Sequence, residues 1–405
     1  MAADRQTARA PRVPGVSDRA GTFIRTSVGG ETYFTFRPKP LPPDPPLEID
    51  VELQDLLDTA NQALGRLDGV TLLLPNPDQF LYSYIRKEAV LSSQIEGTQS
   101  SLSDLLLFEH DVASGVPLED VRETSNYIAA MSHGLKRMEE GFPLSLRLLR
   151  EIHELLLSGG RGGERAPGEF RRTQNWIGGT RPGNARYVPP PVHEVLPSIG
   201  ALEKFLHDDP VRTPVLVKAA LAHAQFETIH PFLDGNGRIG RLLVTLLLCS
   251  EKHRVLSRPL LYLSLYLKRN REEYYTRLQR VRTHGEWEEW LSFFLDGVIE
   301  VSRSATEATQ RIVSLVGSDR QKVLTLGRAA GSASRLYDLA VGDVVFTIPQ
   351  ASRHLGLSGV SVGKAARHLE ELGIVREVTG RTRNKLYVYS DYLEILQEGT
   401  EDAAG

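Results

Sequence analysis

The sequence predicts a mainly α-helical protein that contains one β-hairpin and has a winged helix-turn-helix domain near its end. Apolar residues recur at helical spacing along most of the first 316 residues, as at Leu53, Leu57 and Leu64. Strand formers, two glycine-rich turns and a triple proline at 168–191 predict the hairpin. From about residue 340 the pattern changes to two short helices followed by two alternating strands.

Length and composition indicate a soluble protein with two or three domains. The chain has 405 residues, 41% hydrophobic and 24% charged residues, and a net charge of −3, which argues against a polycation that binds nucleic acid or membranes along its whole length. Cys249 is the only cysteine, so internal disulfides and an all-cysteine metal site are excluded. The start of the chain lacks an apolar signal segment, and the longest apolar run, 242–249, is too short to span a bilayer. We therefore expect a cytoplasmic protein that does not insert into membranes.

The N-terminal part divides into a tail and a helical region. Residues 1–20 are polar and small, which predicts a disordered tail. The region 21–115 is expected to be mainly helical. Its proline-rich segment 36–49 is expected to be extended and to lead into the first helix. Within it we expect helices around 53–64 and over Tyr82–Gln94, and a further helix that a cap at Ser101–Asp104 opens.

The central region is expected to span 116–320. Amphipathic patterns predict helices at Val121–Glu139, Ser145–Leu157 and Pro214–Thr228. The hairpin at 168–191 interrupts them, and further helices are expected to follow it up to about residue 316.

The C-terminal part, 340–395, is the predicted winged helix-turn-helix domain. Gly356 falls in the turn, Ser358 is placed to cap the second helix, and GRTRNK joins the two strands. We expect Val360–Leu372 to be the recognition helix. Its exposed cations and those of the wing are Lys364, Arg367, His368, Arg381, Arg383 and Lys385. Such cations contact DNA phosphates, but the acidic neighbours Glu370, Glu371 and Glu377 weaken the patch, so a protein-interaction or dimerisation module, including a homodimer, stays open.

The most informative stretch is HPFLDGNGRIGR at 230–241. Pro231 and the two glycines prevent a helix before about residue 236, so GNG is expected at a helix N-terminus, where free N–H groups bind anions. Arg238 and Arg241 are three residues apart and share one helix face, where both can bind phosphate oxygens. Asp234 is placed to hold Mg²⁺ against those phosphates, and His230 is placed to act as a general base. Together these groups suit nucleotide transfer from ATP to a protein hydroxyl.

The same stretch matches the signature HPFx[D/E]GNGRxxR in full, and by it the sequence resembles the Fic family. Further segments are similar to that family: GEFRRTQNWIGG and ARYVPPP resemble its target-binding flap, and PLPP and YSYIRKEAVLSSQIEGTQ resemble the region that precedes many Fic cores. The resemblance covers about 30–310 and implies a protein adenylyltransferase whose substrates are ATP, with Mg²⁺, and a Ser, Thr or Tyr hydroxyl of a target protein.

The resemblance also implies a role for individual residues. His230 would deprotonate the hydroxyl, Asp234 would hold Mg²⁺, and Arg238 and Arg241 would bind the β- and γ-phosphates. The remaining residues expected to contact the nucleotide are Gly235, Asn236, Gly237, Ile239 and Gly240, with Tyr187, Tyr274 and Tyr275 near the nucleoside.

Residues 92–97, SSQIEG, fit the Fic inhibitory pattern [S/T]xxxE[G/N]. By that resemblance Glu96 would pair with Arg241 and misalign ATP, and Ser92 would support the helix that carries it. Two alternatives stay open: an ordinary glutamate at a helix end, or a glutamate that orients water and removes AMP from targets.

Two other functions stay open. A related enzyme could transfer another phosphate-linked group or a phosphate, although the complete GNGRxxR favours AMP. A different class of protein, a DNA-binding transcriptional regulator with the Fic core as a sensor, is the alternative to an enzyme.

Overall fold

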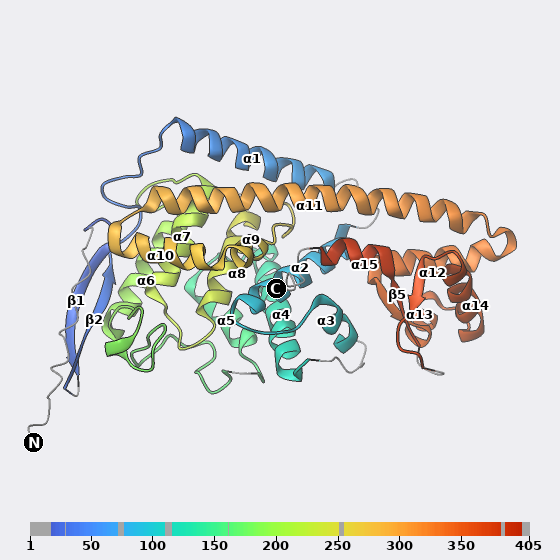
Figure 1. Cartoon of the computed structure of the whole chain (residues 1–405), viewed down its shortest axis with the longest axis horizontal. Helices are drawn as coiled ribbons and strands as arrows, with labels where there is room; N and C mark the ends of the chain where they lie inside the picture. Colours follow the sequence, from blue (N-terminus) through green and yellow to red (C-terminus); the bar gives the residue numbers. More distant parts are fainter. Residues whose placement is uncertain are drawn as a thin grey trace, which may run out of the picture. The chain divides into compact units, whose positions relative to one another are not determined.

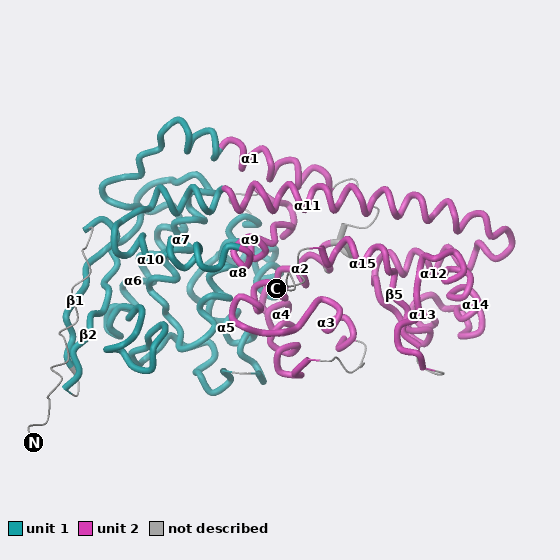
Figure 2. Tube along the Cα trace, in the orientation of Figure 1, with its two compact units in different colours: residues 1–57, 133–250, 270–295 teal, residues 58–132, 251–269, 296–405 magenta. Residues whose placement is uncertain are grey.

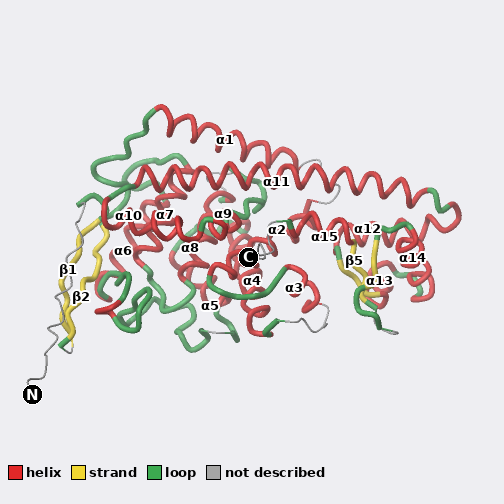
Figure 3. The backbone as a smooth tube through the Cα atoms, in the orientation of Figure 1, coloured by secondary structure: helices red, strands yellow, loops and turns green. Residues whose placement is uncertain are grey.

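The structure is a computed structural model that describes residues 18–28, 30–71, 77–109, 116–160, 162–250, 255–381 and 385–398. Most of the described chain is helical, as predicted, with a two-stranded and a three-stranded sheet (Figures 1 and 3). None of the described helices is both long and apolar enough to cross a bilayer.

The chain forms two compact units, residues 1–57, 133–250 and 270–295 in the first and 58–132, 251–269 and 296–405 in the second (Figure 2). The elements of the first unit are β1 (Gly21–Val28), β2 (Glu31–Pro38), α5 (Leu146–Leu156), η1 (Pro182–Asn184), α6 (Val192–Leu206), α7 (Val215–Ile229), α8 (Asn236–Cys249) and α10 (Arg271–His284). The helices α1 (Val51–Thr71), α4 (Leu118–Glu139) and α11 (Trp287–Leu324) contribute residues to both units.

The core of the first unit is the pair α7 and α8. Nearly every residue of both helices is buried, which explains why neither shows a polar face. Trp290 at the start of α11 donates its indole N–H to the carbonyl of Ala220 in α7, at 2.8 Å. The motif of residues 230–241 begins directly after α7 and continues into α8.

An antiparallel hairpin, β1 and β2, begins the described chain where a helical region from residue 21 was expected. The sequence carries its signal, because TFIRTSV and TYFTF alternate around Gly29-Gly30. β2 also contacts the segment 168–191, since the N–H of Phe36 donates to the carbonyl of Val188 at 3.0 Å. The part of the predicted tail before residue 18 lies outside the described residues.

The hairpin predicted at 168–191 is reduced to a single antiparallel bridge between Ile177 and Tyr187. Gly178 and Gly179 both adopt positive φ, and η1 follows at Pro182, so the chain turns before a second pair of residues can join the ladder.

The second unit contains α2 (Pro77–Ile95), α3 (Leu102–Glu109), α9 (Ser264–Arg269), η2 (Gly327–Ala329), α12 (Ala330–Asp343), β3 (Val345–Thr347), α13 (Ile348–Leu355), α14 (Gly359–Glu371), β4 (Val375–Glu377), β5 (Leu386–Tyr389) and α15 (Ser390–Gln397). The predicted cap of α3 is confirmed: the N–H of Asp104 donates to Ser101 Oγ, and the N–H of Ser101 donates to Asp104 Oδ2. Within this unit α2 contacts α9, α12 and α15.

The C-terminal elements have the predicted order. Gly356 ends α13 in the left-handed region, and Ser358 caps α14 by accepting from the N–H of Ser361. β5 lies between β3 and β4 in an antiparallel sheet. The winged helix assignment stays a prediction, and Arg383 of the predicted wing lies outside the described residues.

Candidate active site

His230 lies directly after α7 and adopts the left-handed region, with φ of 48° and ψ of 60°. This conformation turns the chain out of the helix and exposes 19% of the imidazole side chain. Its carbonyl accepts from Nε of Arg171 at 3.0 Å, and the N–H of Arg171 donates to the carbonyl of Pro231 at 2.9 Å. Arg171 from the segment 168–191 therefore holds the backbone at two successive carbonyls, one through its buried guanidinium and one through its own N–H, and burial lowers the pKa of Arg171 to about 10.

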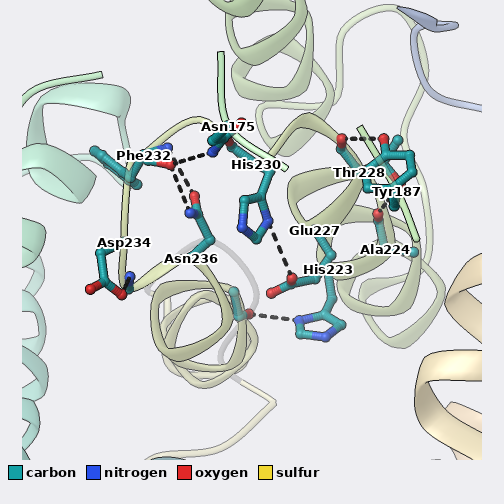
Figure 4. A network of polar contacts seen from close by, with 12 residues as sticks. Asn175, Tyr187, His223, Ala224, Glu227, Thr228, His230, Phe232, Asp234 and Asn236 are labelled. Carbon is teal, nitrogen blue, oxygen red and sulfur yellow. Dashed lines mark hydrogen bonds and ion pairs between the residues drawn. The ribbon is translucent and has the colours of Figure 1, made fainter. Parts of the chain in front are cut away.

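Asn236 closes the loop between the two helices (Figure 4). Its Oδ1 accepts from the N–H of Phe232 and its Nδ2 donates to the carbonyl of Phe232, both at 2.9 Å. Nδ2 of Asn175 donates to the same carbonyl, also at 2.9 Å. The side chain of Asn236 is thus buried as a brace of the loop, because its amide fits the backbone of a tight turn. The expected contact of Asn236 with phosphate stays a prediction.

His153 of α5 supports the loop from the other side. Its ring stacks on Phe232 at a centroid distance of 3.7 Å. The N–H of Gly168 donates to Nδ1, so Nε2 carries the proton and donates to the carbonyl of Asp234 at 3.1 Å. Burial lowers the pKa of His153 to about 4, which keeps this tautomer neutral near pH 7.

The N-terminus of α8 has the backbone geometry that binds an anion. Gly235 precedes the helix with φ of 72°, a conformation that glycine adopts without strain. The N–H groups of Asn236, Gly237 and Arg238 occupy the first turn, where a helix supplies no intrahelical acceptor. These groups and the positive end of the helix dipole favour phosphate oxygens.

Arg238 and Arg241 are both buried on α8, one turn apart, as their spacing predicts. Nη2 of Arg238 lies 3.7 Å from Oδ1 of Asp234. Two guanidinium groups near a helix N-terminus add to its positive potential, so the site suits a polyanion such as a triphosphate.

Asp234 suits magnesium. Its side chain is 41% exposed, and Oδ1 accepts from the N–H of Gly235 at 2.6 Å, which directs the carboxylate toward the helix N-terminus. The described residues contain no group of three or more His, Cys, Asp or Glu side chains that could hold a metal. Magnesium in nucleotide sites needs only one or two carboxylates besides phosphate and water, so this donor set fits it.

Ile239 and Gly240 were expected to contact the nucleotide but lie in the core. Ile239 is fully buried. A Cβ at position 240 would lie 2.6 Å from Oε1 of Glu227 and 3.3 Å from Cε1 of His223, so a larger residue there would displace the Glu227 carboxylate between α7 and α8.

The tyrosines expected near the nucleoside are also placed by packing. The hydroxyl of Tyr187 donates to the carbonyl of Thr228 at 2.6 Å, and the ring lies under Arg282 at 4.0 Å. The hydroxyl of Tyr274 donates to Nε2 of His223 at 2.9 Å, since Nδ1 of His223 donates to the carbonyl of Gly240. Both tyrosines are buried and Tyr275 is half-buried, and a contact of any of the three with the nucleoside stays a prediction.

Two models of a known protein family match the part of the chain that contains this site and the part before it. The Fic/DOC family model matches residues 143–248, and the Fic/DOC family N-terminal model matches residues 54–136. Residues 143–248 form a Fic domain. The match contains α7, the loop and all but the last residue of α8, so the site described above lies within it.

Curated relatives with the printed name "Protein adenylyltransferase Fic" match over much of the chain. The protein from Drosophila erecta is 25% identical over 309 residues, 71% of this chain and 58% of the relative. The protein from Culex quinquefasciatus is 29% identical over 257 residues, 61% of this chain and 46% of the relative. The chain thus spans about half the length of the curated relatives it matches.

A solved structure of a Fic family protein from Desulfovibrio desulfuricans covers 85% of this chain and 98% of its own, with a TM-score of 0.55 and 21% identity. This likeness establishes the fold of the chain.

The predicted inhibitory residues lie in the other unit. Ser92 is buried in α2, and Glu96 is exposed in the turn directly after that helix, before Gly97 with φ of 102°. The pairing of Glu96 with Arg241 of the Fic domain stays a prediction.

Sequence reasoning missed three residues that brace the loop, His153, Arg171 and Asn175, and also Glu227, whose carboxylate lies 3.9 Å from Nδ1 of His230. The first three come from distant parts of the chain and bond mainly to backbone atoms. Only Glu227 had a local signal, because it precedes His230 by three residues on a helix.

Proposed function

We propose that the protein is a protein adenylyltransferase, which transfers AMP from ATP to a Ser, Thr or Tyr hydroxyl of a target protein. The main observation behind this proposal is the loop that connects the half-buried imidazole of His230 to the N-terminus of the buried helix α8. Hydrogen bonds of Asn236 hold this loop in place. The curated relatives' printed names support the same activity.

In this proposal His230 takes the proton from the target hydroxyl. The oxygen then attacks the α-phosphorus of ATP, an O–P bond forms, and the bond to pyrophosphate breaks. The N–H groups of Asn236, Gly237 and Arg238 stabilise the phosphate oxygens, and the guanidinium groups of Arg238 and Arg241 stabilise the departing charge. His153, Arg171 and Asn175 hold the loop so that these groups need no rearrangement.

Asp234 would hold magnesium. The ion would neutralise charge on the phosphates when bound. The described chain itself contributes the carboxylate and the hydrogen bond from Gly235 that orients it.

Mass spectrometry of a modified target, or of the protein itself, tests the proposal against its nearest alternatives. An added AMP on a Ser, Thr or Tyr supports adenylyl transfer. An added phosphate or another phosphate-linked group would show that the same site performs a different transfer.

Autoinhibition by Glu96 is part of the proposal. The carboxylate would compete with the γ-phosphate for Arg241, and the same group could orient a water molecule that removes AMP from a target. The exposed position of Glu96 after α2 and the fit of residues 92–97 to the inhibitory pattern support this role.

DNA binding is a second candidate function. Lys364 and Arg367 are exposed on α14, and Arg381 is exposed after β4. A gel shift at low salt is expected to show binding that weakens steeply as salt rises, because phosphate contacts release counterions. The charge-reversed variant Lys364→Glu/Arg367→Glu should lose binding, whereas His230→Ala should keep it. Absence of a shift at low salt would favour a protein-interaction module, and a homodimer is one form of it.

A cytoplasmic location is also part of the proposal, because a chain with a single cysteine suits a reducing compartment.

A further inference from the structure

Glu227 lies on the last turn of α7, three residues before His230, and its carboxylate faces the imidazole (Figure 4). Oε2 of Glu227 lies 3.9 Å from Nδ1 of His230, within ion-pair range. The glutamate side chain is only 8% exposed. A carboxylate shielded from water in this way interacts more strongly with a neighbouring charge than an exposed one.

The packing of α7 against α8 makes room for this carboxylate. Oε1 of Glu227 occupies the space that a side chain at position 240 would need, and only glycine leaves it free. Gly240 also accepts the hydrogen bond from His223, so the backbone beside Glu227 is fixed. The carboxylate is therefore built into the helix interface.

Two guanidinium groups bond to the backbone beside the imidazole: Arg171 from the segment 168–191 donates to the carbonyl of His230, and Nη2 of Arg282 from α10 donates to the carbonyl of Glu227 at 3.1 Å. Helix α8, which follows the loop, carries two more, Arg238 and Arg241. The other titratable groups nearby are Asp234, Tyr187 and His223, and burial lowers the pKa of His223 to about 4, so it is neutral near pH 7. Guanidinium groups and a helix N-terminus disfavour a further positive charge, and a carboxylate offsets them.

We infer that Glu227 is a positioning residue for His230: its carboxylate, 3.9 Å from Nδ1, favours the orientation that turns Nε2 to the target and stabilises the imidazolium that forms when Nε2 takes a proton. The inference rests on the proposed function. The proton passes from the target hydroxyl to Nε2 as the oxygen bonds to phosphorus and pyrophosphate leaves, and Glu227 takes up no proton in this step, just as the aspartate of serine protease triads takes up none.

An NMR titration of ¹³C-labelled histidine side chains tests this contact without requiring any transfer. The His230 signal is assigned by its loss in His230→Ala. Glu227→Gln is expected to lower the pH midpoint of that signal by about one pH unit, because a neighbouring negative charge favours the imidazolium. Glu227→Asp keeps the charge at a greater distance, so a smaller shift in the same direction is expected. If either variant folds and leaves the midpoint unchanged, the proposal is overturned.

The pH profile of AMP transfer provides the second readout. Glu227→Gln is expected to lower kcat about 10- to 100-fold with little change in KM for ATP, and to move the acid limb to lower pH. A fall in kcat with an unmoved acid limb would indicate a merely structural glutamate and overturn the inference. A wild-type protein that transfers nothing would remove the proposed function, while the NMR result would still decide the role of Glu227.

Discussion

Gly240 shows at the scale of one residue how a motif position can serve packing instead of ligand binding. An alanine Cβ there would lie 2.6 Å from Oε1 of Glu227, closer than a Cβ normally approaches another atom, in an interface with little free space. Gly240 is thus the residue that allows α7 and α8 to approach and the carboxylate to lie between them.

We predict that Gly240→Ala destabilises the protein by about 1–3 kcal/mol, since overpacking forces neighbouring groups to move. Thermal unfolding measures the loss as a lower Tm. The matched control is Gly200→Ala in α6, where an added Cβ meets nothing within 4 Å and helix propensity should leave stability equal or raised. Equal unfolding temperatures for both variants would contradict this account of the interface.

Some residues of the candidate site could be predicted from the sequence, and others could not. His230, Asp234 and the arginines were predictable because their chemistry is concentrated in twelve residues. The brace was not, because His153, Arg171 and Asn175 reach the loop from distant segments, and hydrogen bonds to backbone atoms leave no periodic pattern in a sequence. The partners of Tyr187 and Tyr274 could not be predicted for the same reason, since their hydroxyls bond to the carbonyl of Thr228 and to the ring of His223.

At the scale of elements, helices with a strong periodic pattern were predicted well. The expected helices at 121–139, 145–157 and 214–228 correspond to α4, α5 and α7 within a few residues. The hairpin of β1 and β2 was not predicted although its residues alternate between apolar and polar. The proline-rich segment that follows it is typical of an extended connection to a helix and not of a strand.

Two buried histidines join elements of the first unit: His153 of α5 donates to the loop carbonyl of Asp234, and His223 of α7 donates to the carbonyl of Gly240 in α8. Burial lowers the pKa of His153 and of His223 from 6.5 to about 4. The folded state therefore keeps both neutral while the unfolded chain takes up protons below about pH 6.5. We predict that the free energy of unfolding falls as the pH drops from 6.5 toward 4, by on the order of 2–3 kcal/mol for each histidine.

Urea unfolding at a series of pH values measures this dependence. His223→Asn retains a hydrogen-bond donor but cannot titrate, so the fall between pH 6.5 and 4 should be smaller in that variant. A slope identical to that of the wild type would mean that His223 does not contribute to the acid sensitivity.

At the scale of the whole molecule, the chain joins a Fic domain to a second unit that carries the predicted inhibitory turn and the C-terminal elements. Within the second unit, Lys87 of α2 donates to the carbonyl of Glu398 at 2.8 Å, and Gln397 of α15 donates to Ser103. The helix that leads to Glu96 is therefore in direct contact with the C-terminal end of the described chain.

We predict that Glu96→Gly raises self-modification with labelled ATP by several-fold or more, because Arg241 would then be available to the γ-phosphate. The double variant Glu96→Gly/His230→Ala serves as the control and should incorporate no label. If Glu96→Gly incorporates no more label than the wild type, the proposed autoinhibition by Glu96 is wrong.

The most direct test of the catalytic claim is incubation of the purified protein with α-labelled and γ-labelled ATP in parallel. The account predicts that label from the α position is retained on protein, that label from the γ position is not, and that His230→Ala lowers retention by about 10²-fold or more. Retention of the γ label, or equal retention of the α label by His230→Ala, would contradict it.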